Sequence, residues 1–495
     1  MTVRHGVSYD HLYIGGEWVR SSGEETIEVI TPVTELPLGR VPSATNADVD
    51  RAVAAARHTF DATDWPTRPR ADRVDVLRRL VKVYRDRSDQ IATLITDEMG
   101  CPISLSRGMQ AASPAMLIES YIEAAESFPF EEIRPSSTGT GLITREAVGV
   151  VAAVIPWNSP HASAMLKIAP ALIAGCTVVL KPAPETAIDA LLLGEMLDDA
   201  GVPAGVVNIV PADRAVSEYL VSHPGVDKVA FTGSTLAGRR IASICGNDLR
   251  RVTLELGGKS AGVVFADADL EASVAALRFG AMGNSGQMCV NRTRLLVEAS
   301  AHDELVERLA TMMDTITVGD PHDPATEVGP LVSARQRDRV EGYIRIGTDA
   351  GAQVVRGGGR PGDLDRGYYV EPTLLVGVEN SMRIAQEEIF GPVVTVTPFP
   401  NGDEKEAIRL ANDSEYGLAG SVYTSDLHRG LRVARQVRAG GLDVNGASSG
   451  LQSPMGGFRA SGIGREMGQE GLASFVEVKS IGLPPGLIQE FASHS

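Results

Sequence analysis

The order of apolar and helical segments between about residues 148 and 256 is the feature that most constrains how this chain folds. Short runs rich in β-branched residues alternate there with longer segments whose apolar residues recur at helical spacing. This alternation predicts a parallel, doubly wound α/β sheet, because parallel neighbours need a long crossover that is usually a helix. The predicted strands are, in order, VGVVAAVI, TVVLK, VVNIV, KVAF and RVTLEL.

A second alternating stretch begins after residue 257 and predicts a second α/β domain. AGVVF precedes the helical segment DLEASVAALRFGAMGN, and TRLLVE precedes DELVERLATMM. Residues 126–145 break the helical pattern with polar, extended character and suit an arm that leaves the domain. More than one domain also agrees with the length of 495 residues, which exceeds what one hydrophobic core usually organises.

Charge and apolar patterning exclude several classes of partner. The 46 basic and 63 acidic side chains give a net charge of −17, with no lysine–arginine stripe that would bind a phosphate backbone. No uninterrupted apolar run reaches the length of about 18 residues that a membrane helix needs, and the N-terminus lacks the pattern of a signal peptide. We therefore expect a cytoplasmic protein that binds neither nucleic acid nor a membrane.

The cysteines are scattered along the chain rather than clustered. They form no CxxC pair and no His/Cys group with the spacing of metal ligands. We therefore expect neither a disulfide nor a bound metal. The four cysteines are Cys101, Cys176, Cys245 and Cys289.

Polar and small residues stand at the ends of the predicted strands of the first domain. Asn158 comes after the first strand, Lys181 ends the second, Gly233 and Ser234 follow the fourth, and Glu255 lies near the end of the fifth. Ligands of doubly wound sheets bind beyond the carboxyl ends of the strands. These residues are therefore expected to line one ligand site.

Cys289 and Glu255 together indicate covalent catalysis, although neither does so alone. Cys289 stands among small residues and amides in GNSGQMCVN. A lone cysteine is usually an inert buried side chain, and a strand-end carboxylate is often only a cap or an ion-pair partner. A nucleophilic thiol must lose its proton, however, and a thioester needs an activated water, and one glutamate can serve both steps.

The residues at the other strand ends each have a functional and a purely structural interpretation. The side-chain amide of Asn158 can donate to an oxyanion together with the backbone N–H of Cys289, but Asn158 is an equally good helix N-cap. Lys181 can bind a hydroxyl or phosphate group, or simply be solvated. The backbone N–H groups at Gly233 and Ser234 precede a predicted helix and suit a pyrophosphate, yet there is no GxGxxG motif.

From about residue 12 to residue 480 the chain resembles the aldehyde dehydrogenase superfamily. The resemblance implies an NAD(P)-dependent enzyme of the non-acylating type. Such an enzyme oxidises an aldehyde to a carboxylic acid through a cysteine thiohemiacetal and a thioester that water hydrolyses. The motifs that carry it, in the family's order, are YIGGEW, IPWNSP, LKPAPET, AFTGST, LELGGKS, NSGQMC, EEIFGPV, ANDSEYGLAGSV and GGFRASGIGRE.

Matching these motifs residue by residue implies a role for each site residue. Cys289 would be the nucleophile, Glu255 the general base for thioester hydrolysis and Asn158 the oxyanion donor. Lys167 and Glu466 match positions that the family associates with the proton path near Glu255. The residues implied in cofactor binding are Ile155, Pro156, Trp157, Lys181, Gly233, Ser234, Glu388 and Phe390.

The resemblance also implies how the domains are divided. Residues 1–124 and 146–256 would form the dinucleotide-binding domain, and residues 257–463 the catalytic domain. Residues 125–145 and 464–495, with the run SFVEVKSI, would form a small β element that bridges subunits. A homodimer or homotetramer is expected, because exposed edge strands tend to pair with another chain.

One departure from the family concerns the cofactor. Many NAD-preferring members carry a glutamate three residues after the lysine, where this chain has Pro184, and Glu185 lies one place later. Losing that carboxylate removes an attraction for NAD and a repulsion of the extra phosphate of NADP. NAD is the expected cofactor, with NADP as an alternative.

A second departure concerns the substrate tunnel. The family often places large side chains just after the asparagine, where this chain has Ser159, Ser163 and Leu166. Smaller side chains predict a bulky, long-chain or aromatic aldehyde. The alternatives are an enzyme that acylates coenzyme A, against which Glu255 argues, and a catalytically silent relative with a structural or binding role.

Overall fold

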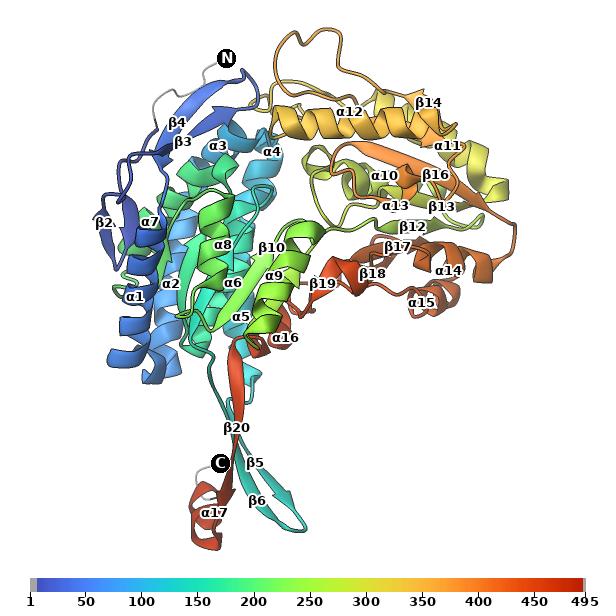
Figure 1. Cartoon of the computed structure of the whole chain (residues 1–495). Coiled ribbons are helices and arrows are strands. Elements are labelled where there is room, and N and C mark those ends of the chain that lie inside the picture. The colour runs from blue at the N-terminus through green and yellow to red at the C-terminus, as the bar shows by residue number, and fades with distance from the viewer. Residues whose placement is uncertain (1–6, 493–495) are drawn as a thin grey trace.

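The computed structural model describes residues 7–492 and contains two α/β domains and a protruding arm (Figure 1). Five adjacent strands of the first sheet are parallel, and all five sequence-predicted strands are found among them. They are β11 (Arg251–Glu255), β10 (Lys228–Thr232), β7 (Val150–Val154), β8 (Thr177–Lys181) and β9 (Val207–Ile209). Antiparallel strands close the edges: β1 (Leu12–Ile14) and β2 (Glu17–Val19) on one side, and β19 (Gly462–Ile463) on the other.

Helices cover both faces of this sheet, which explains why its central strands are apolar at nearly every position. All five residues of β7 and of β8 are buried. One face packs against α1 (Asn46–Ala62), α8 (Arg214–Ser222) and α9 (Thr235–Asn247). The other packs against α6 (Pro160–Ala174) and α7 (Ala187–Asp199). The helices α2 (Arg70–Asp86), α3 (Ser88–Met99) and α5 (Ser113–Ser127) pack in turn on α6 and α7.

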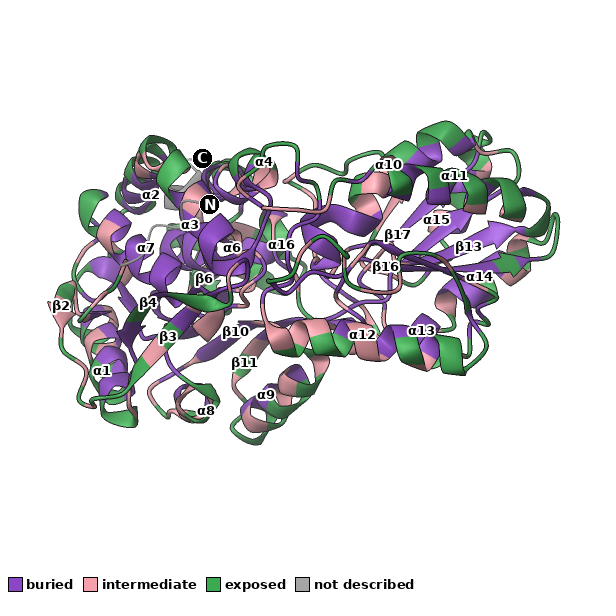
Figure 2. Ribbon diagram, turned by 90° about the horizontal axis from the view of Figure 1, so that it is seen from above, coloured by how far each residue is buried: buried purple, intermediate pink, exposed green. Residues whose placement is uncertain are grey.

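The second sheet has seven strands, and all except β14 run parallel to their neighbours. Figure 2 shows its strands buried and the outer faces of its helices exposed. In spatial order the strands are β14 (Gln353–Arg356), β15 (Thr373–Val376), β16 (Val393–Phe399), β13 (Arg294–Glu298), β12 (Ala261–Val264), β17 (Ala419–Tyr423) and β18 (Gly441–Val444). The helices are α10 (Leu270–Met282), α11 (His302–Asp314), α12 (Ala334–Asp349), α13 (Arg383–Gln386), α14 (Glu404–Asn412) and α15 (Leu427–Ala434).

A three-stranded antiparallel sheet forms the arm that projects from the first domain (Figure 1). Its strands are β5 (Glu131–Ser136), β6 (Gly139–Ala147) and β20 (Val476–Leu483), followed by α17 (Pro485–Ala492). A separate two-stranded sheet joins β3 (Thr26–Thr31) and β4 (Leu36–Pro42).

The segment between the second domain and the arm returns to the first domain. Strand β19 pairs with β11, and α16 (Gly468–Ala473) packs on α5 and α6. The two α/β domains and the β arm agree with the predicted fold class. We propose the predicted domain boundaries with one adjustment, which assigns residues 462–473 to the first domain.

No helix within residues 7–492 combines the length and apolarity that crossing a bilayer requires. Across that same range, no group of three or more His, Cys, Asp or Glu side chains is arranged to hold a metal ion.

Candidate active site

The carboxyl edge of the first sheet brings the predicted strand-end residues together. The register pairs Val154 with Lys181, and Thr232 with Glu255, so these strands end level with one another. Asn158 follows β7 by four residues and is buried. Parallel strands with this register necessarily present their terminal side chains at one edge.

The loop that carries Cys289 approaches this edge from the second domain. After α10, residues Asn284, Ser285 and Gly286 all have positive φ, of 55°, 55° and 73°. Such a run is strained for residues with a Cβ, and strain of this kind concentrates at functional sites. A Cβ at Gly286 would lie 2.1 Å from the carbonyl carbon of Gly391, so only glycine fits there.

Asn158 is tied to this loop through both its side chain and its backbone. Its Nδ2 donates to the carbonyl of Gln287 at 2.9 Å, which leaves one amide hydrogen for another acceptor. Asn284 Nδ2 donates to the carbonyl of Asn158 at 3.1 Å. Ser159 rather than Asn158 occupies the N-cap position of α6. The geometry therefore disfavours the N-cap interpretation of Asn158.

Gln110 also holds Asn158 and was not identified from the sequence. Its Nε2 donates to the Asn158 carbonyl at 2.9 Å, and the side chain is 1% exposed. Gln110 ends a π-helical turn over Ser106–Gln110, closed by a 2.8 Å bond from Ala111 N to the Ser106 carbonyl. Such turns are rare and are frequent at functional sites. No local sequence signal marks this contact, which spans 48 residues.

Glu255 is a buried carboxylate without a hydrogen-bond partner among the described residues. The side chain is 3% exposed, and both carboxylate oxygens are unpaired. Burial, and then the negative charge of Glu466, raise the pKa of Glu255 to about 9. Because this pKa lies above neutral pH, the deprotonated form of Glu255 is a minor fraction there, but it binds a proton strongly and is an effective base.

Lys167 and Glu466 form a buried ion pair beside Glu255. Lys167 Nζ lies 2.8 Å from Glu466 Oε1 and donates to Thr232 Oγ1 at 2.6 Å. The charges of both residues act on the pKa of Glu255, in opposite directions. Tyr121 OH accepts from the backbone N–H of Met467 at 2.7 Å and so fixes the residue that follows Glu466. The family resemblance named Lys167 and Glu466 but not their ion pair, and the sequence did not identify Thr232 or Tyr121.

The thiol of Cys289 is protonated at neutral pH in this arrangement. Burial, and then the charges of Glu388 and Glu255, raise its pKa to about 12, although its own backbone N–H lowers it. Because the thiolate is the nucleophile, the thiol needs a proton acceptor before it can attack.

A second group of predicted residues brings Glu388 and Phe390 of the second domain to the carboxyl edge of the first sheet. Gly258 N donates to Glu388 Oε1 at 3.0 Å. The rings of Trp157 and Phe390 meet edge to face, with centroids 5.4 Å apart. Phe390 has a positive φ of 64°. Glu388 and Phe390 therefore lie at the same place as Trp157, although 233 residues separate Trp157 from Phe390 in sequence.

The remaining cofactor candidates lie along the ends of β8 and β10. Burial lowers the pKa of Lys181 to about 8, and Ile155 N donates to its carbonyl at 3.1 Å. Ser234 caps α9 by accepting from Ala237 N at 3.3 Å. Gly233 N donates to the Glu255 carbonyl at 3.0 Å, so this N–H is already occupied. The helix start available to a phosphate is therefore at Ser234.

Pro184 stands where many NAD-preferring family members have a glutamate. It begins a short 3-10 turn, Pro184–Thr186. Glu185 accepts from Arg335 at 3.2 Å. Its charge also acts on Lys181 and opposes the effect of burial there. A carboxylate thus remains near Lys181 even though Pro184 provides none.

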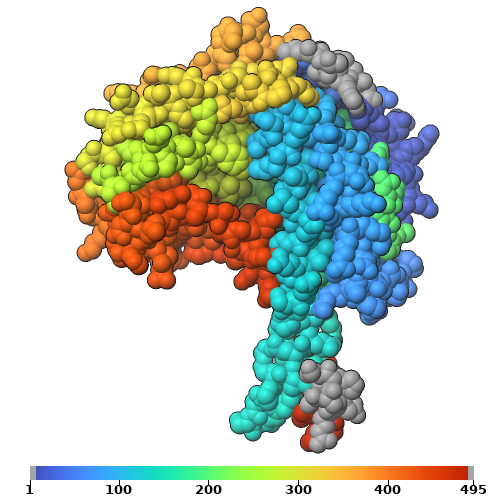
Figure 3. Space-filling model, turned by 180° about the vertical axis from the view of Figure 1, so that it is seen from behind, coloured from blue at the N-terminus to red at the C-terminus, as the bar shows by residue number. Residues whose placement is uncertain are grey.

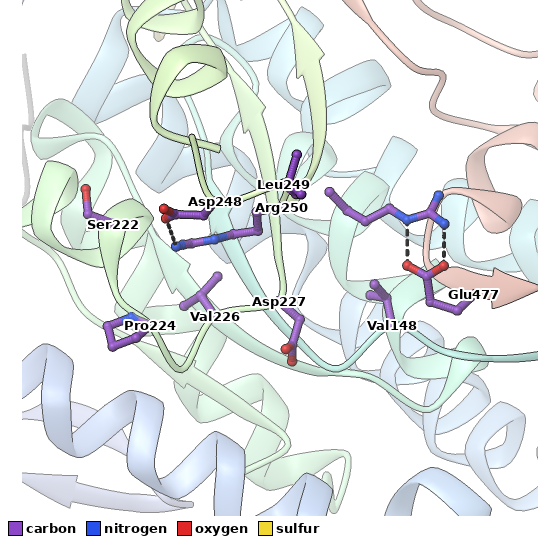
Figure 4. A pocket seen from close by; sticks show the side chains of 10 residues that line it. Val148, Ser222, Pro224, Val226, Asp227, Asp248, Leu249, Arg250 and Glu477 are labelled. Carbon is purple, nitrogen blue, oxygen red and sulfur yellow. Dashed lines mark hydrogen bonds and ion pairs between the residues drawn. The ribbon is translucent and has the colours of Figure 1, made fainter. Parts of the chain in front are cut away.

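The opposite, amino edge of the sheet carries a large surface pocket of about 660 Å³. Figure 4 shows two of its ion pairs, one between Arg250 and Asp248 and one on the carboxylate of Glu477. Its acidic residues are all in ion pairs, which join Arg57 to Asp227, Arg250 to Asp248 and Arg251 to Glu477. This pocket therefore offers a ligand no free acidic group among the described residues.

Comparisons with known proteins agree with the geometry. The model of the aldehyde dehydrogenase family matches residues 18–481. A geranial dehydrogenase of Castellaniella defragrans is 44% identical over 96% of this chain and 99% of its own length. A Mycobacterium tuberculosis aldehyde dehydrogenase solved with NAD⁺ is also 44% identical, with a TM-score of 0.95 over 97% of this chain and 99% of that one.

A third relative was solved with an aldehyde bound. Aldehyde dehydrogenase C of Pseudomonas syringae, a mutant in complex with NAD⁺ and octanal, is 37% identical, with a TM-score of 0.92 over 96% of both chains. The family model and these relatives span nearly the whole chain. The resemblance drawn from the motifs is confirmed, and the chain belongs to the aldehyde dehydrogenase family.

Proposed function

We propose that this protein oxidises a bulky or long-chain aldehyde to the carboxylic acid, with NAD as the preferred cofactor. The observation that carries the proposal is the meeting of Cys289, Asn158 and Glu255 at the carboxyl edge of the first sheet. These three groups provide a nucleophile, an oxyanion donor and a base, which covalent oxidation of an aldehyde requires.

In the first step Glu255, directly or through a water, takes the thiol proton of Cys289, and the sulfur attacks the aldehyde carbon. The resulting thiohemiacetal carries a negative oxygen. The free amide hydrogen of Asn158 and the backbone N–H of Cys289 would donate to this oxygen. Because Gln110, Asn284 and Gln287 already fix Asn158, the donor is oriented before the substrate arrives.

The thiohemiacetal then loses a hydride and becomes a thioester. The nicotinamide cofactor supplies the hydride acceptor. Lys167 and Glu466 would receive and pass on the proton that Glu255 took from the thiol, because their ion pair lies within electrostatic reach of it, so the carboxylate is free again. Water then attacks the thioester carbon while Glu255 takes a proton from that water. As the carbon–sulfur bond breaks, Glu255 returns this proton to the sulfur, which restores the Cys289 thiol.

The residues present fit a dinucleotide. The start of α9 at Ser234 suits a pyrophosphate, and the buried amine of Lys181 can donate to a ribose. The adjacent residues Ile155 and Pro156 would contact the same ligand. Glu388 and Phe390 lie where the nicotinamide half would reach Cys289. The relatives solved with NAD⁺, together with the acidic Glu185 beside Lys181, favour NAD over NADP.

A bulky or long-chain substrate is supported by the small residues of α6 and by a hollow beside the Cys289 loop. Figure 3 shows a recess where residues 100–120 meet the second domain. A pocket of about 370 Å³ in this region is lined by Leu105, Phe279, Met282 and Asn284, among others. We propose that the aldehyde enters here, past Ser159, Ser163 and Leu166. The relatives named for geranial and solved with octanal act on or bind aldehydes of this size.

We also propose that the arm joins subunits into a homodimer or homotetramer. Val478 and Ile481 on β20 are 64% and 41% exposed, and apolar strands at a sheet edge favour pairing with another chain. Light scattering during size-exclusion chromatography measures the assembly. A monomer at micromolar concentration would contradict this part of the proposal.

The test is the absorbance of reduced cofactor with aldehydes from acetaldehyde to octanal, geranial and benzaldehyde. NAD and NADP are assayed separately, and Cys289→Ala is the control. We expect turnover without coenzyme A, preference for the larger aldehydes and no activity in the variant. A strict requirement for coenzyme A would favour the acylating alternative, and inactivity with every pair would favour a silent relative. Preference for acetaldehyde would contradict only the substrate proposal.

A further inference from the structure

A small cavity lies at the amino ends of the central strands of the second sheet, apart from the catalytic groups. Its volume is about 10 Å³, which is room for one water molecule or one monatomic ion. Lys259 and Ser260, just before β12, form one wall, and Arg294 at the start of β13 forms another. The loops before β17 and β18 complete it.

Two residues that line this cavity each have a polar side-chain atom without a hydrogen-bond partner among the described residues. These atoms are the amine Nζ of Lys259 and the hydroxyl of Ser260, and both residues are at least 97% buried. Buried polar groups without a partner are rare in folded proteins, and an unpaired ammonium is especially costly. The two orphaned atoms therefore point to a bound species.

The charge around the cavity is of one sign. Its charged lining residues are Lys259, Arg294 and Arg438, and no acidic side chain is among the described residues that line it. Arg294 is held by neutral oxygens, donating to Asn380 Oδ1 and to the carbonyls of Lys259, Leu410 and Ala411. None of these acceptors carries a charge that would neutralise the two buried cations.

The carboxylates near the cavity act only from outside it. Glu388 and Glu387 attract the charge of Lys259, but they do not contact its amine, and Arg294 and Arg339 oppose them. Asp413 attracts the charge of Arg294 but is not among the residues that line the cavity. Glu388 is instead bonded to the N–H of Gly258. Burial, followed by the repulsion from Arg294, lowers the pKa of Lys259 to about 7. An anion beside the amine would restore its charged form.

We propose that this cavity is a binding site for one small monovalent anion of the chloride type, held by the Lys259 amine and the Ser260 hydroxyl. The anion neutralises the buried charge and satisfies both orphaned groups. It also fixes the turn at Gly258, whose N–H binds Glu388 and where a Cβ would lie 2.9 Å from the carbonyl oxygen of Cys289. The bound anion therefore stabilises the backbone at Gly258, which lies beside Cys289.

Thermal unfolding of the full-length protein tests the proposal in solution. Chloride replaces gluconate at constant ionic strength and pH. We expect a saturable rise in Tm of about 1–3 °C with chloride, because a ligand that binds only the folded state stabilises it. Lys259→Met should abolish the rise and Ser260→Ala should weaken it. Lys228→Met is the matched control, since Lys228 is also buried but already donates to Thr253 at 2.6 Å.

Crystals of the wild-type protein provide a measurement that needs no variant. At a long X-ray wavelength chloride scatters anomalously and water does not. We expect one anomalous peak between Lys259 Nζ and Ser260 Oγ. Density without an anomalous signal would show a water and overturn the proposal. Equal Tm values in chloride and gluconate, or a rise that Lys259→Met retains, would also overturn it. If Lys259→Met does not fold, Ser260→Ala and the diffraction experiment decide.

Discussion

The two edges of the first sheet differ in whether their acidic side chains are exposed and paired or buried and unpaired. At the amino edge the acidic groups Asp227, Asp248 and Glu477 each form an ion pair with an arginine, and all three side chains are more than 35% exposed. Figure 4 shows the pairs of Asp248 and Glu477. At the carboxyl edge Glu255 is buried, has no partner and has a raised pKa. Paired surface charges are stable and inert, whereas an unpaired buried carboxylate can take up a proton near neutral pH. The difference supports the proposal that the reaction takes place at the carboxyl edge.

Replacing the unpaired carboxylate of Glu255 should have the largest effect on kcat. We expect Glu255→Gln to lower kcat by about 10²–10⁴-fold, because the amide cannot accept the proton of the attacking water. Steady-state assays at pH 8 measure the loss, and thermal unfolding checks that the variant is folded. A kcat within threefold of the wild-type value would show that another group is the base.

Removing the oxyanion donor should be the next largest change. We expect Asn158→Ala to lower kcat by about 10²–10³-fold with little change in KM, because the donor acts mainly on the charge that develops during attack. Stopped-flow measurement of cofactor reduction isolates this step. A large rise in KM with an unchanged kcat would instead indicate that Asn158 only binds the aldehyde.

Gln110 tests whether the oxyanion donor must be held in place. We expect Gln110→Leu to lower kcat by about tenfold, since a small displacement of Asn158 weakens its hydrogen bond to the oxyanion. Gln110→Glu loses the same donor while keeping the shape of the side chain, and should show a similar loss. Wild-type kcat in both variants, with normal Tm, would remove Gln110 from the account.

The charges around Glu255 should set the pH dependence. Glu255 acts as a base only when deprotonated, so the rate of thioester hydrolysis should rise as the pH approaches the raised pKa of about 9. Glu466→Gln removes a negative charge that raises this pKa, so the rise should move to lower pH. Thr232 still accepts from Lys167 in that variant. A pH profile that stays in place would contradict the coupling.

A substitution at the amino edge of the sheet should have the smallest effect on kcat. Asp248→Asn breaks the ion pair with Arg250, but Asp248 is 42% exposed and such pairs contribute about 0–1 kcal/mol. We expect an unchanged kcat and a free energy of unfolding within about 1 kcal/mol of the wild-type value. A strong loss of activity would show that the two edges are coupled and would weaken the comparison.

The sequence predicted most of the first sheet and the groups at its carboxyl edge. The reason is that β-branched runs and crossovers determine strand direction, and parallel strands present their ends together. Asn158, Lys181 and Glu255 follow directly from that geometry. Cys289 needed its pairing with Glu255, and Glu388 and Phe390 needed the family resemblance, because they arrive from another domain.

Other residues of the site could not be predicted from the sequence, because only tertiary structure brings them together. Gln110 lies in a π-helical turn that has no pattern in the sequence and contacts Asn158 across 48 residues. The N–H of Gly233 is occupied by a neighbouring strand, which a local motif does not reveal. That the amine of Lys259 has no hydrogen-bond partner among the described residues is likewise seen only in the tertiary structure.

The most direct test of the account is mass spectrometry of Glu255→Gln after mixing with octanal and NAD. Loss of Glu255 removes the base of both steps, but a thiol can still lose its proton to a solvent base, whereas water attacks a thioester very slowly without a base. Hydrolysis should therefore slow more than acylation, and the thioester should accumulate. We expect an added octanoyl mass on the peptide that contains Cys289, together with a burst of reduced cofactor. An unmodified Cys289 with no burst, or release of product only after coenzyme A is added, would contradict it.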